Sequence, residues 1–177
     1  MGLKSKKVVL TTLMIILIAS TSYGFELKTR YTTIIYDDQK QLRKFDDKLY
    51  LGRLRYLLRK RKDITVAEAV KNKVDLITEK VETVLEMFPN PLKFTLVLLS
   101  TPRDVQNAYQ KIYGRKVNYI AFYSPKENTV FISVKRAKLR VLAHEFGHVV
   151  VENYFEVSPP AKIHEVLAQF AETHITD

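Results

Sequence analysis

Hydrophobic and polar positions follow two different periods along this chain, and together they are typical of a protein that mixes strands with helices. Short runs rich in β-branched and aromatic residues predict strands, whereas longer stretches with apolar residues three or four positions apart predict helices. The predicted elements are strands at 29–36 and 92–100, helices at 38–62, 65–87 and 101–114, a hairpin with strands at 117–123 and 129–134, and helices at 135–154 and 160–175. This order predicts an α+β or mixed α/β fold.

Local signals set several of these boundaries. Thr65, followed three residues later by Glu68, forms a capping box that opens a helix. Pro102 is typical of a helix start and Gly114 of a helix end. The strand at 92–100 is nearly continuous in apolar residues, which predicts that both of its faces are buried.

The first 24 residues have the organisation of a secretory signal peptide. Lysines precede the apolar run Val8–Ala19, and a stretch of small and polar residues leads to Gly24. Cleavage there leaves residues 25–177 as a single domain, exported to the periplasm or the extracellular space. The alternative is an uncleaved signal anchor, because residues 8–25 just reach the length of a membrane-spanning helix.

Composition excludes some chemistry and raises the question of an anionic partner. The chain has no Cys, which excludes disulfides, thiolate metal ligands and a Cys nucleophile. The net charge is +10, and the densest basic run is Arg53–Lys62 (RLRYLLRKRK). In an exported protein this run favours an anionic membrane or cell-envelope surface over nucleic acid. The alternative is a solvated helix face whose apolar residues turn to the core.

The segment at 141–151, VLAHEFGHVVV, carries the candidate chemistry. Apart from His144, Glu145 and His148 every residue in it is apolar or Gly, which predicts a buried helix. His144 and His148 are four residues apart, so both project from one helix face and can converge on one Zn²⁺. Glu145 is turned about 100° away, where HExxH helices carry the general base for a zinc-bound water.

A catalytic zinc needs a third protein ligand from another element. Val151 and Tyr154 stand where the extended motif HExxHxxGxxH requires Gly and His, which excludes the metzincin solution. Glu152 continues the same helix and cannot complete a tetrahedron with both histidines. The remaining downstream candidates are Glu156, His164, Glu165, Glu172, His174 and Asp177.

The last predicted helix narrows this choice, because only one of its faces can look at the metal. Glu165, Gln169 and Glu172 share one face. Glu165 follows the proline-initiated helix start by one turn, which suits a ligand. Gln169, one turn further on, can accept a hydrogen bond from the distal ring nitrogen of either histidine. The alternative is that this face is only the solvated face of an amphipathic helix.

HEFGH followed by a Pro-initiated helix with Glu165, Ala168 and the aromatic Phe170 resembles the gluzincin branch of HExxH zinc metallopeptidases, particularly the small bacterial peptidase-MA-like domains. The resemblance covers about 118–173. It implies a minimal zincin-like α+β domain, in which a small mixed sheet with an edge hairpin packs on a buried HExxH helix and a following Glu-bearing helix.

The same resemblance implies the parts of the site. Zinc is expected between His144, His148 and Glu165, with Glu145 as the general base. The family holds an extended peptide substrate along an edge strand, which here is expected at 129–134.

The chain also departs from the family. Larger gluzincins take an oxyanion-stabilising His or Tyr from a later subdomain, so a local donor is expected here, with Tyr119, Tyr123 and Tyr154 as candidates. Val166 replaces the usual Gly of the family. The expected function is an exported zinc-dependent hydrolase of peptide bonds. The alternative is a non-catalytic envelope module that keeps the zinc site and binds an anionic surface through Arg53–Lys62.

Overall fold

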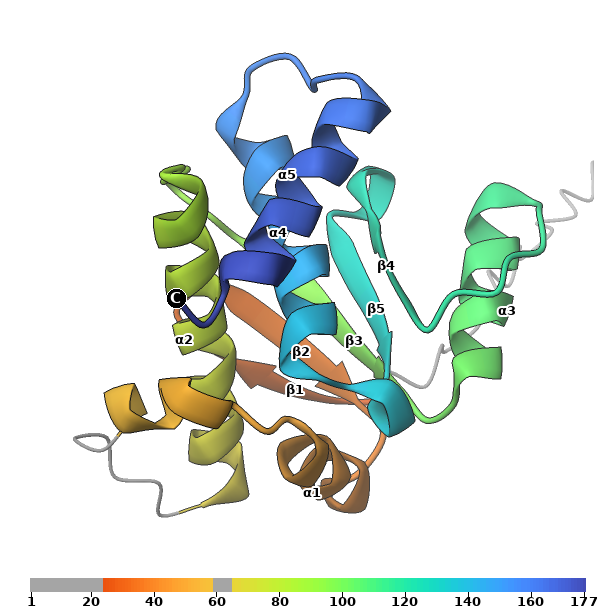
Figure 1. The fold of residues 1–177 in the computed structure, drawn as a ribbon. Coiled ribbons are helices and arrows are strands. Elements are labelled where there is room, and N and C mark those ends of the chain that lie inside the picture. The colour runs from red at the N-terminus through yellow and green to blue at the C-terminus, as the bar shows by residue number, and fades with distance from the viewer. Residues whose placement is uncertain (1–23, 59–64) are drawn as a thin grey trace, which may run out of the picture.

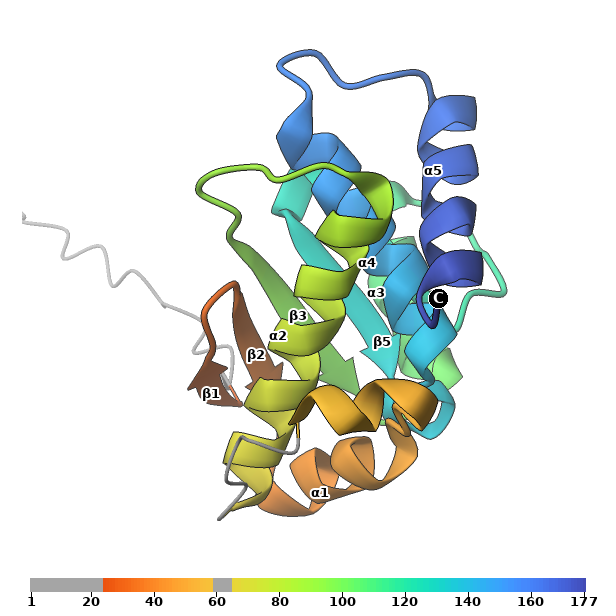
Figure 2. The ribbon, with the colours of Figure 1, turned by 60° about the vertical axis from the view of Figure 1, so that its left-hand side comes forward.

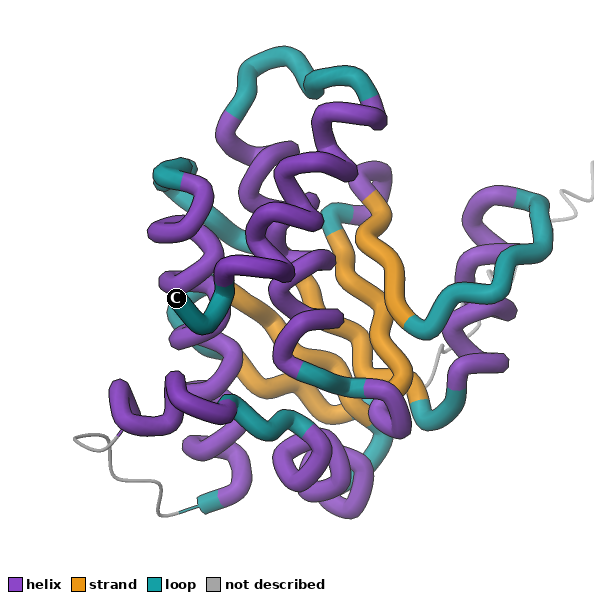
Figure 3. Tube along the Cα trace, in the orientation of Figure 1, coloured by secondary structure: helices purple, strands orange, loops and turns teal. Residues whose placement is uncertain are grey.

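The computed structural model describes residues 24–58 and 65–177, which form a five-stranded sheet with helices packed against it (Figures 1 and 3). The strands are β1 (Phe25–Lys28), β2 (Thr32–Tyr36), β3 (Phe94–Leu99), β4 (Ala121–Ser124) and β5 (Thr129–Ser133). The helices are α1 (Gln39–Lys48), α2 (Val66–Leu85), α3 (Pro102–Tyr113), α4 (Leu139–Tyr154) and α5 (Ala161–His174). Short 3₁₀ helices are η1 (Gly52–Leu58), η2 (Pro125–Glu127) and η3 (Val134–Arg136). The predicted α+β class is confirmed.

Two features predicted from the sequence lie wholly or partly outside the residues that the structure describes. The signal peptide expected at 1–24 lies outside the described residues except for Gly24, and so does the end of the basic run, residues 59–62. Among the residues that the structure describes, no helix is both long and apolar enough to cross a membrane.

The sheet has the strand order β1-β2-β3-β5-β4 and mixed strand directions. β2, β3 and β5 run parallel, whereas β1 is antiparallel to β2 and β4 is antiparallel to β5. The prediction that the strand at 129–134 forms the edge is therefore wrong, because β5 lies between β3 and β4. This inner position keeps Val130 and Ile132 fully buried. The edge of the sheet at this end is β4.

The main core lies between one face of the sheet and the helices α1, α2 and α4. Figure 2 shows α2 and α4 side by side over this face, with α5 packed on α4. On the opposite face α3 covers only one end, where Val105, Tyr109 and Phe122 form a smaller cluster. β3 accordingly alternates between buried and half-buried residues, so only one of its faces is fully buried where both were predicted.

The capping signals read from the sequence set the helix boundaries as predicted. The Thr65 side chain accepts a hydrogen bond from the N–H of Glu68, whose carboxylate returns to the Thr65 N–H, and α2 begins there. α3 begins at Pro102 and ends at Gly114, which adopts a left-handed conformation with φ +73° that side chains disfavour.

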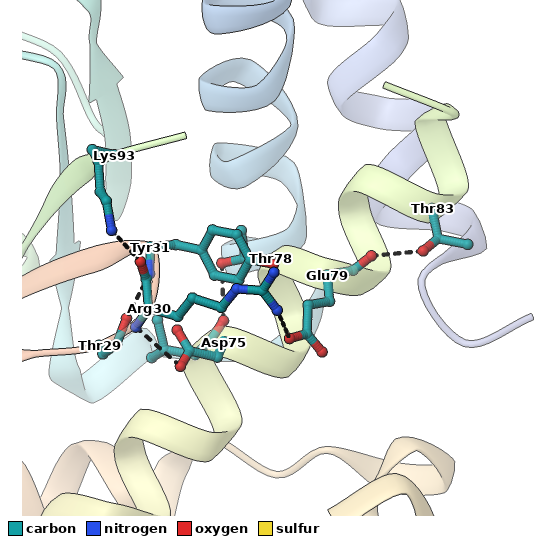
Figure 4. A network of polar contacts seen from close by, with 9 residues as sticks. Thr29, Arg30, Tyr31, Asp75, Thr78, Glu79, Thr83 and Lys93 are labelled. Atoms are coloured by element: carbon teal, nitrogen blue, oxygen red, sulfur yellow. Dashed lines mark hydrogen bonds and ion pairs between the residues drawn. The ribbon is translucent and has the colours of Figure 1, made fainter. Parts of the chain in front are cut away.

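The turn between β1 and β2 was not predicted, because the sequence there was interpreted as a single strand. Thr29 Oγ1 accepts two backbone hydrogen bonds of the turn, at 2.9 and 3.2 Å. Figure 4 shows how Arg30 ties the turn to α2: its N–H donates to Asp75 and its guanidinium to Glu79. Lys93, just before β3, donates to the Arg30 carbonyl. The strand pair is thus held by contacts distant in sequence.

The long helix predicted at 38–62 is divided in two. α1 ends at Lys48, and Gly52 takes a left-handed conformation with φ +58° at the start of η1. Leu54 and Leu58 after the break are buried and four residues apart, as Phe45 and Leu49 are before it, so apolar residues keep a helix-like spacing on both sides. That spacing explains why the break was missed.

Candidate metal centre

Helix α4 carries His144, Glu145 and His148 in a largely buried setting. Its apolar residues are buried along most of its length, as the sequence predicted. Glu145 is only 7% exposed, and all three side chains line a cleft of about 740 Å³. A buried carboxylate or imidazole without a partner is costly, so each of these groups needs one.

Glu165 of α5 meets the two histidines. The Nε2 atoms of His144 and His148 lie 3.2 Å apart. Oε1 of Glu165 lies 3.5 Å from Nε2 of His144, and Oε2 of Glu165 lies 3.6 Å from Nε2 of His148. Ligands at zinc bond lengths of about 2.1 Å occupy tetrahedral corners about 3.4 Å apart. The two histidine nitrogens are already close to this spacing, and one ligand atom from each of the three residues lies within 4.8 Å of the other two. The three side chains could therefore hold one zinc ion, and among the described residues no other group of three such side chains could hold a metal.

Helix α5 reaches the histidines because it approaches α4 closely at Gly147. A Cβ placed on Gly147 would lie 2.8 Å from the Cα of Ala168 and 3.3 Å from the Cβ of Ala171. Both alanines are fully buried. Glu165 is one turn before Ala168 on the same helix, so this contact between the helix backbones fixes where its carboxylate lies.

Glu172, one turn after Ala168, holds the ring of His144. Its carboxylate lies 3.1 Å from Nδ1 of His144. A hydrogen bond at Nδ1 favours the tautomer whose Nε2 lone pair is free for a metal. From the sequence, Gln169 was expected in this role and Glu172 was one of several candidate ligands, but Gln169 is exposed. A shared helix face did not distinguish the two residues.

Glu145 has a partner on the neighbouring edge strand. The backbone N–H of Tyr123 in β4 donates a hydrogen bond to its carboxylate. Burial raises the pKa of Glu145 to about 8, the negative charges of Glu165 and Glu172 also raise it, and the Tyr123 hydrogen bond lowers it. A carboxyl group with a pKa near neutrality suits proton transfer.

His148 is held in its neutral form. Burial, and to a smaller extent the neighbouring His144 and His164, lowers its pKa to about 4. Neutral imidazole is the form that binds metal ions. At neutral pH the residue is therefore ready to act as a ligand without losing a proton.

The three tyrosines proposed as oxyanion donors lie in different places. Tyr119 and Tyr123 line the cleft, whereas Tyr154, 48% exposed, is not among the described residues that line it. The Tyr123 hydroxyl donates to Asn128, 3.0 Å away in the hairpin turn. Tyr123 therefore meets Glu145 through its backbone rather than its side chain.

A second polar cluster, Glu152, Ser158 and His164, lies in the same cleft. His164 Nε2 lies 3.1 Å from both the Glu152 carboxylate and Ser158 Oγ, and the hydroxyl donates to Glu152 over 2.7 Å. Because Glu152 and Ser158 contact the same ring nitrogen, this is no Ser–His–Glu relay. The cluster joins the end of α4 to the start of α5. The sequence did not predict this cluster, because its residues come from α4, the following loop and α5 and form no recognisable motif.

The other predicted candidates lie away from the histidine pair. His174 stacks on Phe170 with ring centroids 4.1 Å apart, and its Nδ1 contacts the Phe170 carbonyl.

In the basic run, Arg53 and Arg55 are exposed, while Leu54 between them is buried. An apolar residue thus turns to the core within a charged stretch.

The arrangement combines three side chains that could hold a metal through nitrogen and oxygen atoms with a separate buried carboxylate in one cleft. A His, His, Glu set is used by catalytic zinc sites, which keep the fourth position for water or substrate. No protein-family model, curated protein or solved structure matches this chain.

Proposed function

We propose that this protein is a zinc-dependent metallopeptidase with a minimal gluzincin-type, zincin-like domain. One observation carries the proposal: a ligand atom from each of His144, His148 and Glu165 lies within 4.8 Å of the other two, close enough for one zinc ion to bind all three. The buried carboxylate of Glu145 beside them supplies the group that hydrolysis needs in addition to the metal. No comparable proton-transfer group would be required of a purely structural zinc site.

In this proposal each side chain has a distinct role. Zinc bound here supplies a Lewis acid that activates water and polarises an amide carbonyl. Glu145 accepts a proton from the attacking water and returns it to the leaving amine. The Tyr123 N–H holds the Glu145 carboxylate in place, and Glu172 orients the ring of His144.

We place the peptide substrate along β4 rather than along the strand at 129–134. The N–H of Ser133 donates to the carbonyl of Ile120 over 2.9 Å, which identifies Ile120 and Ser133 as a hydrogen-bonded antiparallel pair. In this register the backbone N–H and C=O groups of Ala121 and Tyr123 point away from β5. Because the Tyr123 N–H binds Glu145, the groups left for a peptide are the N–H and C=O of Ala121 and the C=O of Tyr123. Both residues line the cleft, so an extended peptide can add to this edge.

The cellular setting is proposed from the sequence. Export through residues 1–24 leads to the periplasm or the extracellular space, with no nucleic-acid partner. The exposed Arg53 and Arg55 can contact an anionic membrane or envelope surface. Fractionation with N-terminal sequencing tests this part, with Phe25 as the expected first residue. A membrane-bound chain that retains Met1 would favour an anchor at 8–25 instead.

The function is tested by metal analysis coupled to cleavage of a peptide mixture. We expect one zinc per chain and hydrolysis that falls by about 10²- to 10⁴-fold in Glu145→Gln, with zinc retained. Glu26→Gln, on the exposed strand β1, is the matched control and should change neither. Zinc without any cleavage would favour the non-catalytic envelope module, and a chain that binds no zinc would contradict both.

A further inference from the structure

The cleft continues beyond the edge of β4 onto the other face of the sheet. On the side of α4 and α5 it is lined by the histidines and carboxylates of the metal centre. On the side of α3 it is lined by Tyr109 and Tyr119. The proposed mechanism uses only the first half, so the aromatic half has no assigned role.

The aromatic half of the cleft consists of rings that pack edge to face. Tyr119 meets Tyr109 edge to face, with centroids 5.3 Å apart and planes at 87°. Tyr109 meets Phe122 in the same way at 5.0 Å, and the Arg115 guanidinium donates to the Tyr109 hydroxyl. Tyr109 is 7% exposed and Tyr119 44% exposed. Tyr109 is therefore held in place within the cluster, whereas Tyr119 presents a surface that a ligand can contact.

Side chains along β4 alternate between the face of the sheet next to the metal half of the cleft and the face next to the aromatic half. Ala121 and Tyr123 contribute to the main core beneath α4, whereas Phe122 belongs to the cluster beneath α3. A peptide that pairs with β4 alternates in the same way. Where one of its side chains faces the metal half, the next one along faces Tyr109 and Tyr119.

We propose that Tyr119, supported by Tyr109, forms a subsite that selects an aromatic side chain of the peptide substrate, next in sequence to a residue facing the metal half. This inference rests on the proposed function. An incoming ring can join the edge-to-face series because the exposed part of Tyr119 continues it. Tyr119 is then a specificity-determining residue.

The test measures binding apart from turnover. Zinc-loaded Glu145→Gln is titrated with pairs of short peptides that differ only by Phe or Ala, with the variable residue moved along the sequence. At one position we expect Phe to bind about tenfold more tightly than Ala. Adding Tyr119→Ala should remove most of this ratio, whereas Tyr119→Phe should keep it. Tyr50→Ala, an exposed tyrosine outside the cleft, is the matched control.

Cleavage by the wild-type protein separates this inference from the proposed function. A ratio that survives Tyr119→Ala, or no position that prefers Phe, overturns the subsite even when peptides are hydrolysed. A ratio that depends on Tyr119 supports the subsite even when the wild-type protein cleaves none of the bound peptides, which would overturn the peptidase. Zinc content and circular dichroism confirm that each variant is folded.

Discussion

At the scale of single residues, the candidate metal centre depends on the groups that touch its histidines and carboxylates as much as on those side chains themselves. His144 is fixed by Glu172, and Glu145 is fixed by the N–H of Tyr123. Both contacts come from elements other than α4. The two histidines and Glu145 follow from the HExxH motif, but the orientation of their side chains follows from the fold.

Removing the partner of His144 should weaken zinc binding. In Glu172→Ala the ring of His144 loses the acceptor at Nδ1, 3.1 Å away, and we expect the zinc affinity to fall by about 10- to 100-fold. Competition with a chromophoric chelator measures it. Gln169→Ala, an exposed change on the same helix, is the control. Loss of affinity in Gln169→Ala alone would return the role to Gln169.

Glu82 in α2 provides a pH-dependent contribution that is independent of the metal centre. Burial raises its pKa and the nearby Arg30 lowers it. Because its pKa is higher in the folded than in the unfolded state, Glu82 favours folding only at low pH, and this contribution is lost as pH rises through the folded pKa.

Glu82→Gln should therefore increase the free energy of unfolding at pH 7, and the gain should vanish below about pH 4, where Glu82 is protonated in both states. Denaturant unfolding at the two pH values measures it. The exposed Glu86→Gln serves as the control and should give a smaller difference. An equal gain at both pH values would show that charge at Glu82 is not its cause.

At the scale of elements, the approach of α5 to α4 brings Glu165, the proposed third ligand, beside the two histidines. Gly147 normally counts against a helix, and Ala in its place would gain up to about 1 kcal/mol of helix propensity. Here the added Cβ would lie 2.8 Å from the Cα of Ala168, a backbone atom that cannot rotate away. The steric term and the propensity term therefore have opposite signs.

We expect the steric term to win in Gly147→Ala. The variant should lose about 1–3 kcal/mol of unfolding free energy and bind zinc more weakly, because α5 and Glu165 are displaced. Chemical denaturation with and without zinc separates the two effects. A more stable variant with unchanged zinc affinity would show that the helices can separate without cost to the site.

The elements also show what a sequence can predict. Helices with explicit caps, such as α2 at Thr65 and α3 at Pro102, begin where the local signals place them. The pairing of strands depends on residues far apart in the chain, so β1 was missed and β5 was wrongly placed at the edge. In the site, the i, i+4 spacing predicted that the two histidines converge, and the helix face and the family resemblance pointed to Glu165, which lies beside them. Glu172 as the orienting residue and the Tyr123 N–H required the packing itself.

At the scale of the whole molecule, the site joins two helices, α4 and α5, that differ in how deeply they are buried in the main core. α4 is buried in the main core, whereas α5 packs on its outer side and keeps Ile163, Val166 and Phe170 exposed. A metal shared by α4 and α5 would therefore tie a peripheral helix to a central one.

Zinc should stabilise the folded protein, because the unfolded chain does not bring His144, His148 and Glu165 together. Free zinc at a thousand times its dissociation constant should contribute about 4 kcal/mol, and a chelator should remove it. Thermal unfolding with zinc and with chelator measures the difference, and His144→Ala should abolish it. Hydrogen exchange should then place the chelator-sensitive protection in α5, since α4 stays covered by the core. Loss of protection throughout the sheet instead would mean that the metal supports the whole fold and that α5 is no separate unit.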